Sequence, residues 1–215
     1  DTPDQIRKLI VDFKNAVDVA DPLILIDQEG GRVQRLGPPH WPAYPAAGCV
    51  AALAKMEPVE GQRYMSLLGR LLASDLEPLG ITVNCAPVLD VLQPETHEII
   101  GDRALGDDPS QVATFGRAFS EGLLAGGVLP VIKHLPGHGR ARVDSHAELP
   151  RVYTPLTELE AVDFSPFHAL RDMPLAMTAH VVFEALDPDR PVTTSPSALR
   201  RAIRGRIGYG GLLMS

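Results

Sequence analysis

The stretch VLPVIKH, residues 128–134, is an unbroken apolar run that ends in a lysine and a histidine. A strand with one face in water alternates apolar and polar residues, whereas a strand covered on both faces is apolar throughout. Four other stretches share this character, namely LILID (23–27), ITVNCAP (81–87), LAMTAHV (175–181) and GLLMS (211–215). We therefore predict five buried strands of a parallel sheet.

Helical patterns separate these apolar runs. Residues 62–79 predict a helix whose apolar face carries Leu67, Leu68, Leu71, Leu72 and Leu76. Residues 111–125 predict a second helix with Ser110 as its N-cap, and Ser195, followed by a proline, is the expected N-cap of a third. Strand–helix alternation of this kind is typical of βαβ units and a parallel sheet.

The positions of the polar residues favour a (β/α)8 barrel over a doubly wound sheet. Five of them lie at or near the carboxyl ends of predicted strands: Asp27, Asn84, Lys133, His134 and His180. In a barrel those ends converge on one site, whereas a nucleotide-binding doubly wound sheet carries a Gly-rich fingerprint that is absent from this sequence. We therefore expect an α/β fold of the TIM-barrel type.

The length predicts that this barrel is incomplete. A full barrel has eight strands and about 250 residues, but the chain has 215 residues and five predicted strands. We expect residues 1–215 to form a single, partial catalytic barrel domain with material missing at both ends.

The composition narrows the functional class. A chain with 45% hydrophobic and 22% charged residues is of the soluble globular type. Its net charge of −7 argues against a nucleic-acid partner, and we interpret the one arginine cluster, at 200–206, as a solvated helix face. No apolar run approaches the roughly 20 residues of a membrane span. Two cysteines make no disulfide framework, so a reducing, cytoplasmic compartment is expected.

The loop KHLPGHGRARVDSH, residues 133–146, concentrates groups that can perform chemistry. His134 and His138 have the spacing of a helical zinc motif, but a Pro-Gly pair between them prevents a helix, so no metal is predicted. Lys133 at a strand end is a candidate Schiff-base lysine. Asp144 and His146 lie on either side of Ser145. This spacing predicts an acid/base dyad, because a carboxylate orients an imidazole and raises its pKa.

The stretch DQEGGRVQRL, residues 27–36, follows the first predicted strand directly. The carboxylate of Asp27 can accept hydrogen bonds from sugar hydroxyls, and Arg32 and Arg35 supply donors. We interpret this turn as part of a ligand site, because a charged residue ends a buried strand.

Two further loops carry candidates whose roles the sequence leaves open. Arg103 either binds a ligand through its guanidinium fork or forms an internal ion pair with Asp102 or Asp107. His180 lies near the end of the fourth predicted strand and Glu184 lies in the loop after it. Either side chain can contact a ligand, and His180 can instead be a histidine of the core.

The segments LILIDQEGGRVQRL, GDRALGDDP, VIKHLPGHGRARVDSH and GLLMS resemble, in order, the glycoside hydrolase family 3 β-N-acetylglucosaminidases (β-hexosaminidases) of bacterial peptidoglycan recycling. The resemblance extends over nearly the whole chain. The KH(F/L)PGHG…DSH pattern distinguishes this branch from the β-glucosidases, which lack the histidine loop.

The resemblance implies roles for individual residues. It implies a substrate-binding set that consists of Asp27, Arg35, Arg103, Lys133 and His134. It also implies that His146 is the general acid/base with Asp144 as its partner, in a retaining hydrolysis that uses neither a metal nor an organic cofactor. The nucleophilic aspartate is expected just after Ser215, and we interpret Asp90 as structural.

The expected substrate is a small carbohydrate, a muropeptide with terminal β-linked N-acetylglucosamine, and the expected location is the cytoplasm. Three alternatives remain open. Phosphate can replace water as the acceptor, because a histidine acid/base does not repel it. The protein can bind sugar without catalysis, or it can be an unrelated barrel aldolase that uses Lys133.

Overall fold

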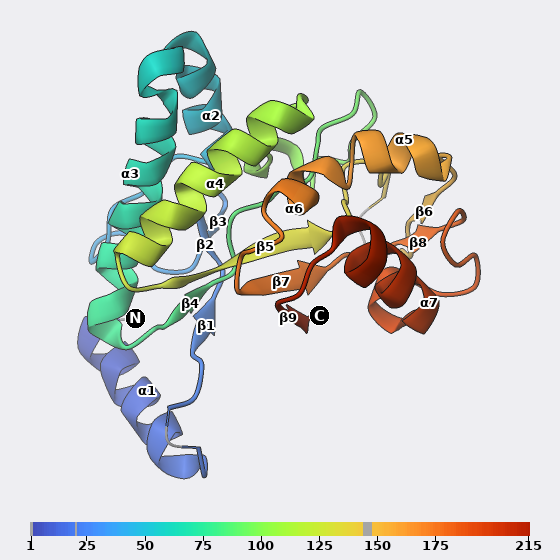
Figure 1. Ribbon diagram of the computed structural model, residues 1–215. Coiled ribbons are helices and arrows are strands. Elements are labelled where there is room, and N and C mark those ends of the chain that lie inside the picture. The colour runs from blue at the N-terminus through green and yellow to red at the C-terminus, as the bar shows by residue number, and fades with distance from the viewer. Residues whose placement is uncertain (1, 20, 144–147) are drawn as a thin grey trace.

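The fold is built on one five-stranded parallel sheet (Figure 1), in a computed structural model that describes residues 2–19, 21–143 and 148–215. Its strands, in spatial order, are β1 (Leu25–Ile26), β4 (Val83–Asn84), β5 (Leu129–Leu135), β7 (Leu175–Thr178) and β9 (Leu212–Met214). Every neighbouring pair is parallel. Each of the five predicted apolar runs therefore overlaps one strand of this sheet, and β5 extends one residue past its run.

The strand order confirms the barrel-type prediction. The strands follow one another in space as they do in the chain, whereas a doubly wound sheet reverses its order at a switch point. The connecting helices α3, α4 and α6 lie along one side of the curled sheet (Figure 1). The described residues thus form an arc of a (β/α)8 barrel, with β1 and β9 as its two edges.

The remaining elements connect or flank the sheet. The helices are α1 (Pro3–Ala16), α2 (Ala47–Met56), α3 (Pro58–Leu76), α4 (Pro109–Ala125), α5 (Leu156–Ala161), α6 (Ser165–Ala169) and α7 (Pro196–Ala198). Three 3-10 helices are η1 (Glu77–Leu79), η2 (Gly101–Arg103) and η3 (Val192–Thr194), and η4 (Leu199–Ile207) is π-helical. Strands β2 (Gln28–Gly30) and β3 (Val33–Gln34) pair antiparallel, and β6 (Arg151–Val152) pairs parallel with β8 (Val182–Phe183).

Helix α3 has a narrower buried face than predicted. Leu68, Leu72 and Leu76 are buried, but Leu67 and Leu71 are 45% and 49% exposed. The three buried leucines are spaced by four residues and form one row along the helix. The two exposed leucines lie on the flank of that row, so their assignment to the buried face was wrong.

The start of helix α4 also differs from the prediction. Asp108, not Ser110, is the N-cap, and its carboxylate accepts a hydrogen bond from the backbone N–H of Ser110 at 2.8 Å. Pro109 takes the first helical position, where its missing N–H is no loss. The proline therefore moves the helix start upstream of the predicted position.

The third predicted N-cap is confirmed. The Ser195 hydroxyl accepts a hydrogen bond from the backbone N–H of Ala198 at 3.0 Å, and Pro196 begins α7. The helical chain continues into η4, where the arginines at 200, 201, 204 and 206 are all exposed, as predicted.

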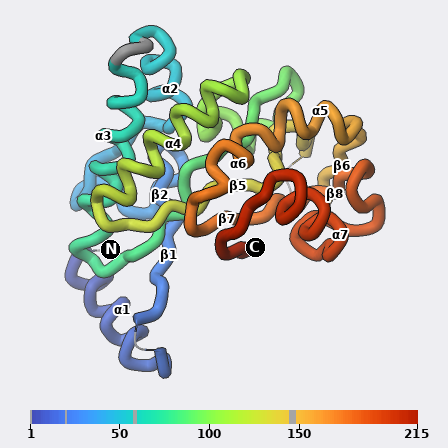
Figure 2. Tube along the Cα trace, viewed as in Figure 1, coloured from blue at the N-terminus to red at the C-terminus, as the bar shows by residue number. Residues whose placement is uncertain are grey.

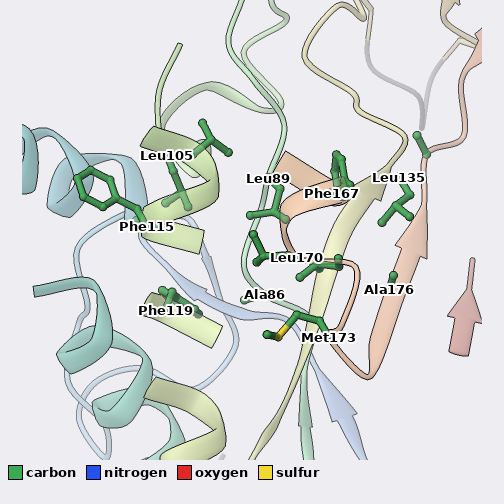
Figure 3. Packing of buried hydrophobic residues seen from close by; sticks show 14 of the residues in the cluster. Ala86, Leu89, Leu105, Phe115, Phe119, Leu135, Phe167, Leu170, Met173 and Ala176 are labelled. Carbon is green, nitrogen blue, oxygen red and sulfur yellow. The ribbon is translucent and has the colours of Figure 1, made fainter. Parts of the chain in front are cut away.

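The central strands β4, β5 and β7 are largely buried on both faces, which explains their unbroken apolar sequences. The prediction of five buried strands was wrong for the two edge strands, because Leu25 of β1 and Leu212 of β9 are 42% and 57% exposed. The main core lies between the sheet and the helices, and Figure 3 shows Leu89, Leu170 and Met173 of this cluster beside β5. On the opposite face, Val83 and Val131 belong to a second buried cluster.

Helices α1 and α7 lie toward opposite ends of the molecule (Figure 2). Helix α1 begins with a capping box, in which Thr2 and Gln5 exchange hydrogen bonds. Among the helices described, none combines the length and apolar character that a membrane crossing requires.

Candidate active site

A cavity of about 210 Å³ opens where the carboxyl ends of the strands converge. Its lining comes from the segments that follow four strands: Ile99, Ile100 and Arg103 after β4, His134 and His138 from β5 onward, Met177, Thr178 and His180 at β7, and Ser215 after β9. This is the edge of a barrel at which active sites form. The predicted residues Arg103, His134 and His180 therefore share one cavity.

Charged residues beside this cavity form a continuous chain of ion pairs. Lys133 is nearly fully buried, and its Nζ lies 3.1 Å from Oδ1 of Asp27 and 2.5 Å from Oε1 of Glu29. Arg103 binds Glu29 through two parallel bonds of 2.8 and 2.9 Å. At the outer end, Nη2 of Arg35 lies 3.9 Å from Oδ2 of Asp27. Four predicted substrate-binding residues thus lie in one network, joined through Glu29.

The network sets the charge state of Glu29. Burial alone would raise the pKa of the Glu29 carboxyl, but Arg103 and Lys133 outweigh burial and hold that pKa below its usual value. Nζ of Lys133 is engaged by the carboxylates of Asp27 and Glu29, and Lys133 is not among the residues that line the cavity. Because imine formation requires an amine that can meet the substrate carbonyl, this geometry disfavours the aldolase alternative.

Arg103 forms an internal ion pair and also lines the cavity, but its partner is Glu29 and neither of the two partners expected from the sequence. Asp102 is directed outward and accepts from Nε of Arg32 at 3.1 Å, and Asp107 has no bond to Arg103 among the described residues. Glu29, the observed partner, was not singled out from the sequence. The available signal was its position two residues after Asp27, in the turn that follows a buried strand.

Asp90 organises the start of the loop after β5. It is fully buried, and its Oδ2 lies 2.7 Å from Nδ1 of His134. Its Oδ1 accepts hydrogen bonds from the backbone N–H groups of His134, at 3.2 Å, and His138, at 2.7 Å. Burial alone would raise the pKa of Asp90, but the neighbouring histidines lower it to about 2. Asp90 is therefore an ionised acceptor at neutral pH, in keeping with the structural role expected for it.

His138 lies against His134 in the same buried corner. The two rings meet edge to face, with centroids 5.6 Å apart. Burial is the main cause that lowers the pKa of His138 to about 4, so its ring is neutral near pH 7. Its Nδ1 has no hydrogen-bond partner among the residues that the structure describes.

The predicted dyad, Asp144 and His146, lies outside the described residues. The segment before it is anchored: Arg140 donates to the buried Asp163 at 2.7 Å and pairs with Glu158 at 3.0 Å. Burial raises the pKa of Asp163 to about 6, although Arg140 opposes that rise.

His180 and Glu184, whose roles could not be decided from the sequence, have different surroundings. His180 is exposed and lines the cavity. Glu184 accepts a bond of 2.7 Å from Arg151 at the surface and is not part of the cavity lining.

A larger hollow of about 470 Å³ lies beside the loop after β5. Its three arginines are each matched with carboxylates: Arg140 with Asp163 and Glu158, Arg142 with Glu95, and Arg151 with Glu184. This hollow therefore offers little uncompensated positive charge to an anion.

Comparison with known proteins adds an independent line of evidence. Residues 2–215 match the profile described as "Glycosyl hydrolase family 3 N terminal domain". A curated protein named "Beta-hexosaminidase" from Alkalilimnicola ehrlichii is 38% identical over 216 residues, which cover 100% of this chain and 61% of that protein.

Two solved structures share the fold closely. The structure of NagZ from Neisseria gonorrhoeae in complex with N-trifluoroacetyl-D-glucosamine has a TM-score of 0.93 at 32% identity, over 100% of this chain and 63% of that one. A glycoside hydrolase family 3 β-N-acetylglucosaminidase from Paenibacillus has a TM-score of 0.90 at 32% identity, over 99% and 40%. The chain thus spans less than two thirds of the length of these relatives.

Proposed function

Because the chain belongs to glycosyl hydrolase family 3, we propose that it supplies the substrate-binding barrel of an exo-acting β-N-acetylglucosaminidase. The observation that carries this proposal is the ionic network from Arg35 to Arg103 at the carboxyl edge of the sheet. A network of this kind holds donors and acceptors in fixed positions, which is what recognition of a polyhydroxylated sugar requires.

The network leaves suitable groups for a sugar. The Asp27 carboxylate is 40% exposed, although Lys133 is bound to its Oδ1. Arg103 and His134 line the neighbouring cavity. A hydroxyl-bearing ring can therefore donate to the carboxylate while it accepts from the guanidinium. The names of the relatives, β-hexosaminidase and β-N-acetylglucosaminidase, support N-acetylglucosamine as that sugar.

The proposed mechanism is a double displacement with retention. An aspartate proposed to follow Ser215 attacks the anomeric carbon, the glycosidic C–O bond breaks, and His146 donates its proton to the leaving oxygen. His146 then removes a proton from water, which attacks the same carbon and releases the aspartate. Asp144 orients the imidazole and stabilises its charged form.

The natural substrate proposed is a muropeptide with terminal β-linked N-acetylglucosamine, cleaved in the cytoplasm. The resemblance of the histidine loop to the peptidoglycan-recycling branch supports this finer assignment. We propose water as the acceptor of the glycosyl group. Phosphate is the alternative acceptor to test, because a histidine acid/base does not repel it.

The decisive experiment compares two aryl β-glycosides, an N-acetylglucosaminide and a glucoside, with the full-length protein. We expect turnover of the N-acetylglucosaminide alone, and added phosphate should yield no sugar 1-phosphate. Turnover of neither glycoside would contradict the proposal and leave a non-catalytic sugar-binding protein as the better account.

The role of His146 is tested by leaving-group dependence. His146→Ala should slow hydrolysis of a phenyl glycoside by about 100-fold or more, and that of a 2,4-dinitrophenyl glycoside far less, because a good leaving group needs no proton. His168→Asn is the matched control, since His168 is an exposed histidine on α6. Equal losses with both leaving groups would remove the acid role from His146.

A further inference from the structure

The buried carboxylate of Asp90 makes three contacts that divide between its two oxygens. Oδ1 faces the backbone N–H groups of His134 and His138, while Oδ2 faces Nδ1 of His134. Asp90 has no solvent exposure, so no bulk water competes for these contacts. An ionised carboxylate only accepts hydrogen bonds. Nδ1 of His134 must therefore carry a proton.

This requirement has a consequence on the other side of the ring. A neutral imidazole carries one proton, so a His134 that is protonated at Nδ1 has a bare Nε2. His134 also lines the cavity, and Nε2 is the ring nitrogen that remains for a ligand there. A bare Nε2 accepts a hydrogen bond, so the group that it recognises must donate one.

We propose that Asp90 is a positioning residue that fixes the tautomer of His134, so that Nε2 presents an acceptor to a hydroxyl group of the sugar. The recognised sugar is that of the proposed function, on which this part of the inference rests. The tautomer itself depends only on the contacts of Asp90, and it can be measured without turnover.

The substitution Asp90→Asn provides a sharp test, because the backbone dictates which way the amide points. The two N–H groups at Oδ1 require an oxygen, so the Asn carbonyl oxygen must take that place. The Asn NH2 group then faces Nδ1 of His134 and donates to it. Nδ1 must lose its proton, and the neutral ring must change to the Nε2–H tautomer.

The measurement is two-dimensional ¹⁵N–¹H long-range NMR of the full-length protein labelled at histidine, with His134 assigned through His134→Gln. We expect the Nδ1–H tautomer in the wild type and the Nε2–H tautomer in Asp90→Asn. Asp163→Asn is the matched control, because Asp163 is also buried and holds the same loop through Arg140. This control should leave the tautomer of His134 unchanged.

The kinetic readout separates positioning from a merely structural role. With an aryl N-acetylglucosaminide, Asp90→Asn should raise KM about tenfold and change kcat much less, because an altered tautomer removes a binding contact rather than a reacting group. A loop that was simply displaced would lower kcat together with the affinity.

Each outcome has one meaning. A proton on Nε2 in the wild type, in the Nε2–H tautomer or in a doubly protonated ring, would overturn the proposal even if the variant fails to fold, and so would an Nδ1–H tautomer that persists in Asp90→Asn. A tautomer that switches while the wild type cleaves no glycoside would support the positioning role and refute the proposed function. Normal glycosidase activity with no switch would refute the positioning role alone.

Discussion

Nζ of Lys133 lies 2.5 Å from Oε1 of Glu29, and these side chains are only 2% and 4% exposed. Lys133 belongs to β5, whereas Glu29 lies in the hairpin strand β2 that follows β1, and β4 separates β1 from β5 in the sheet. The pair therefore connects segments across the mouth of the barrel arc. Removing two charges from water is costly, and Asp27 and Arg103 offset that cost with further contacts.

The first prediction concerns this buried pair. Lys133→Met should lower the free energy of unfolding by about 3–5 kcal/mol, because it leaves a buried carboxylate with one partner fewer. Urea unfolding of the purified variant measures the change. Lys55→Met is the control, since Lys55 is exposed and lies 3.8 Å from Asp107, where a pair contributes at most about 1 kcal/mol.

A double substitution tests whether the two charges depend on each other. Adding Glu29→Gln to Lys133→Met should destabilise the protein by less than the sum of the two single changes, because each single change already removes the contact between Lys133 and Glu29 and the double variant cannot lose it twice. Strict additivity of the two losses would contradict the pairing.

The second prediction concerns the guanidinium fork of Arg103. Arg103→Lys should raise KM for an aryl N-acetylglucosaminide by about tenfold or more, because a lysine cannot make the two parallel bonds that hold the side chain beside the cavity. Arg117→Lys is a matched control: Arg117 also binds a carboxylate through two bonds, but at the outer surface with Asp172. A similar KM change in both variants would contradict a role at the site.

The third prediction concerns pH and His138. Burial lowers the pKa of this histidine to about 4, whereas an unfolded chain titrates near 6.5. Between these values the unfolded state binds more protons, so the stability that neutral His138 contributes is present above pH 6.5 and is lost as the pH falls toward 4. The effect is on the order of 3 kcal/mol.

The measurement compares urea unfolding of the wild type and His138→Gln at pH 4.5 and 7. The variant should lose less stability on acidification. The comparison between the two proteins is needed because Asp163, with a pKa raised to about 6, contributes in the opposite direction over part of this range. Equal losses in both proteins would show that His138 does not titrate as described.

The fourth prediction concerns the close approach of Gly139 to the chain after β4. A Cβ at Gly139 would lie 1.9 Å from the backbone oxygen of Val91. Gly139→Ala should therefore destabilise the protein by about 1–3 kcal/mol, and it should lower kcat/KM by shifting the loop of His134. Gly210→Ala is the control, because no atom lies within 4 Å of its added Cβ. Melting temperature and steady-state kinetics provide the two readouts.

The strands and their order were predictable from local sequence. Burial on both faces requires unbroken apolar runs, as the central strands β4, β5 and β7 show, and each of the five runs overlaps one strand of the sheet. The same regularity predicted that polar residues at strand ends would meet, as Asp27 and Lys133 do. By contrast, Leu67 and Leu71 on the flank of α3 were wrongly predicted to be buried. The positions of the leucines in the sequence do not show how wide a face of α3 is covered by α4.

The partners of the charged residues were not predictable in the same way. Arg103 has Asp102 next to it in the chain, yet it binds Glu29, and the role of Asp90 becomes visible only beside His134. The sequence by itself determined the five segments that hold the strands of the main sheet and the barrel class of the fold, because those properties depend on the local order of apolar and polar residues. The strand bounds were less accurate, since four of the five strands begin one or two residues later than their apolar runs, and the short strands β2, β3, β6 and β8 were not predicted. The tertiary structure decided which charges meet, because the curvature of the sheet brings together loops that are distant in the chain.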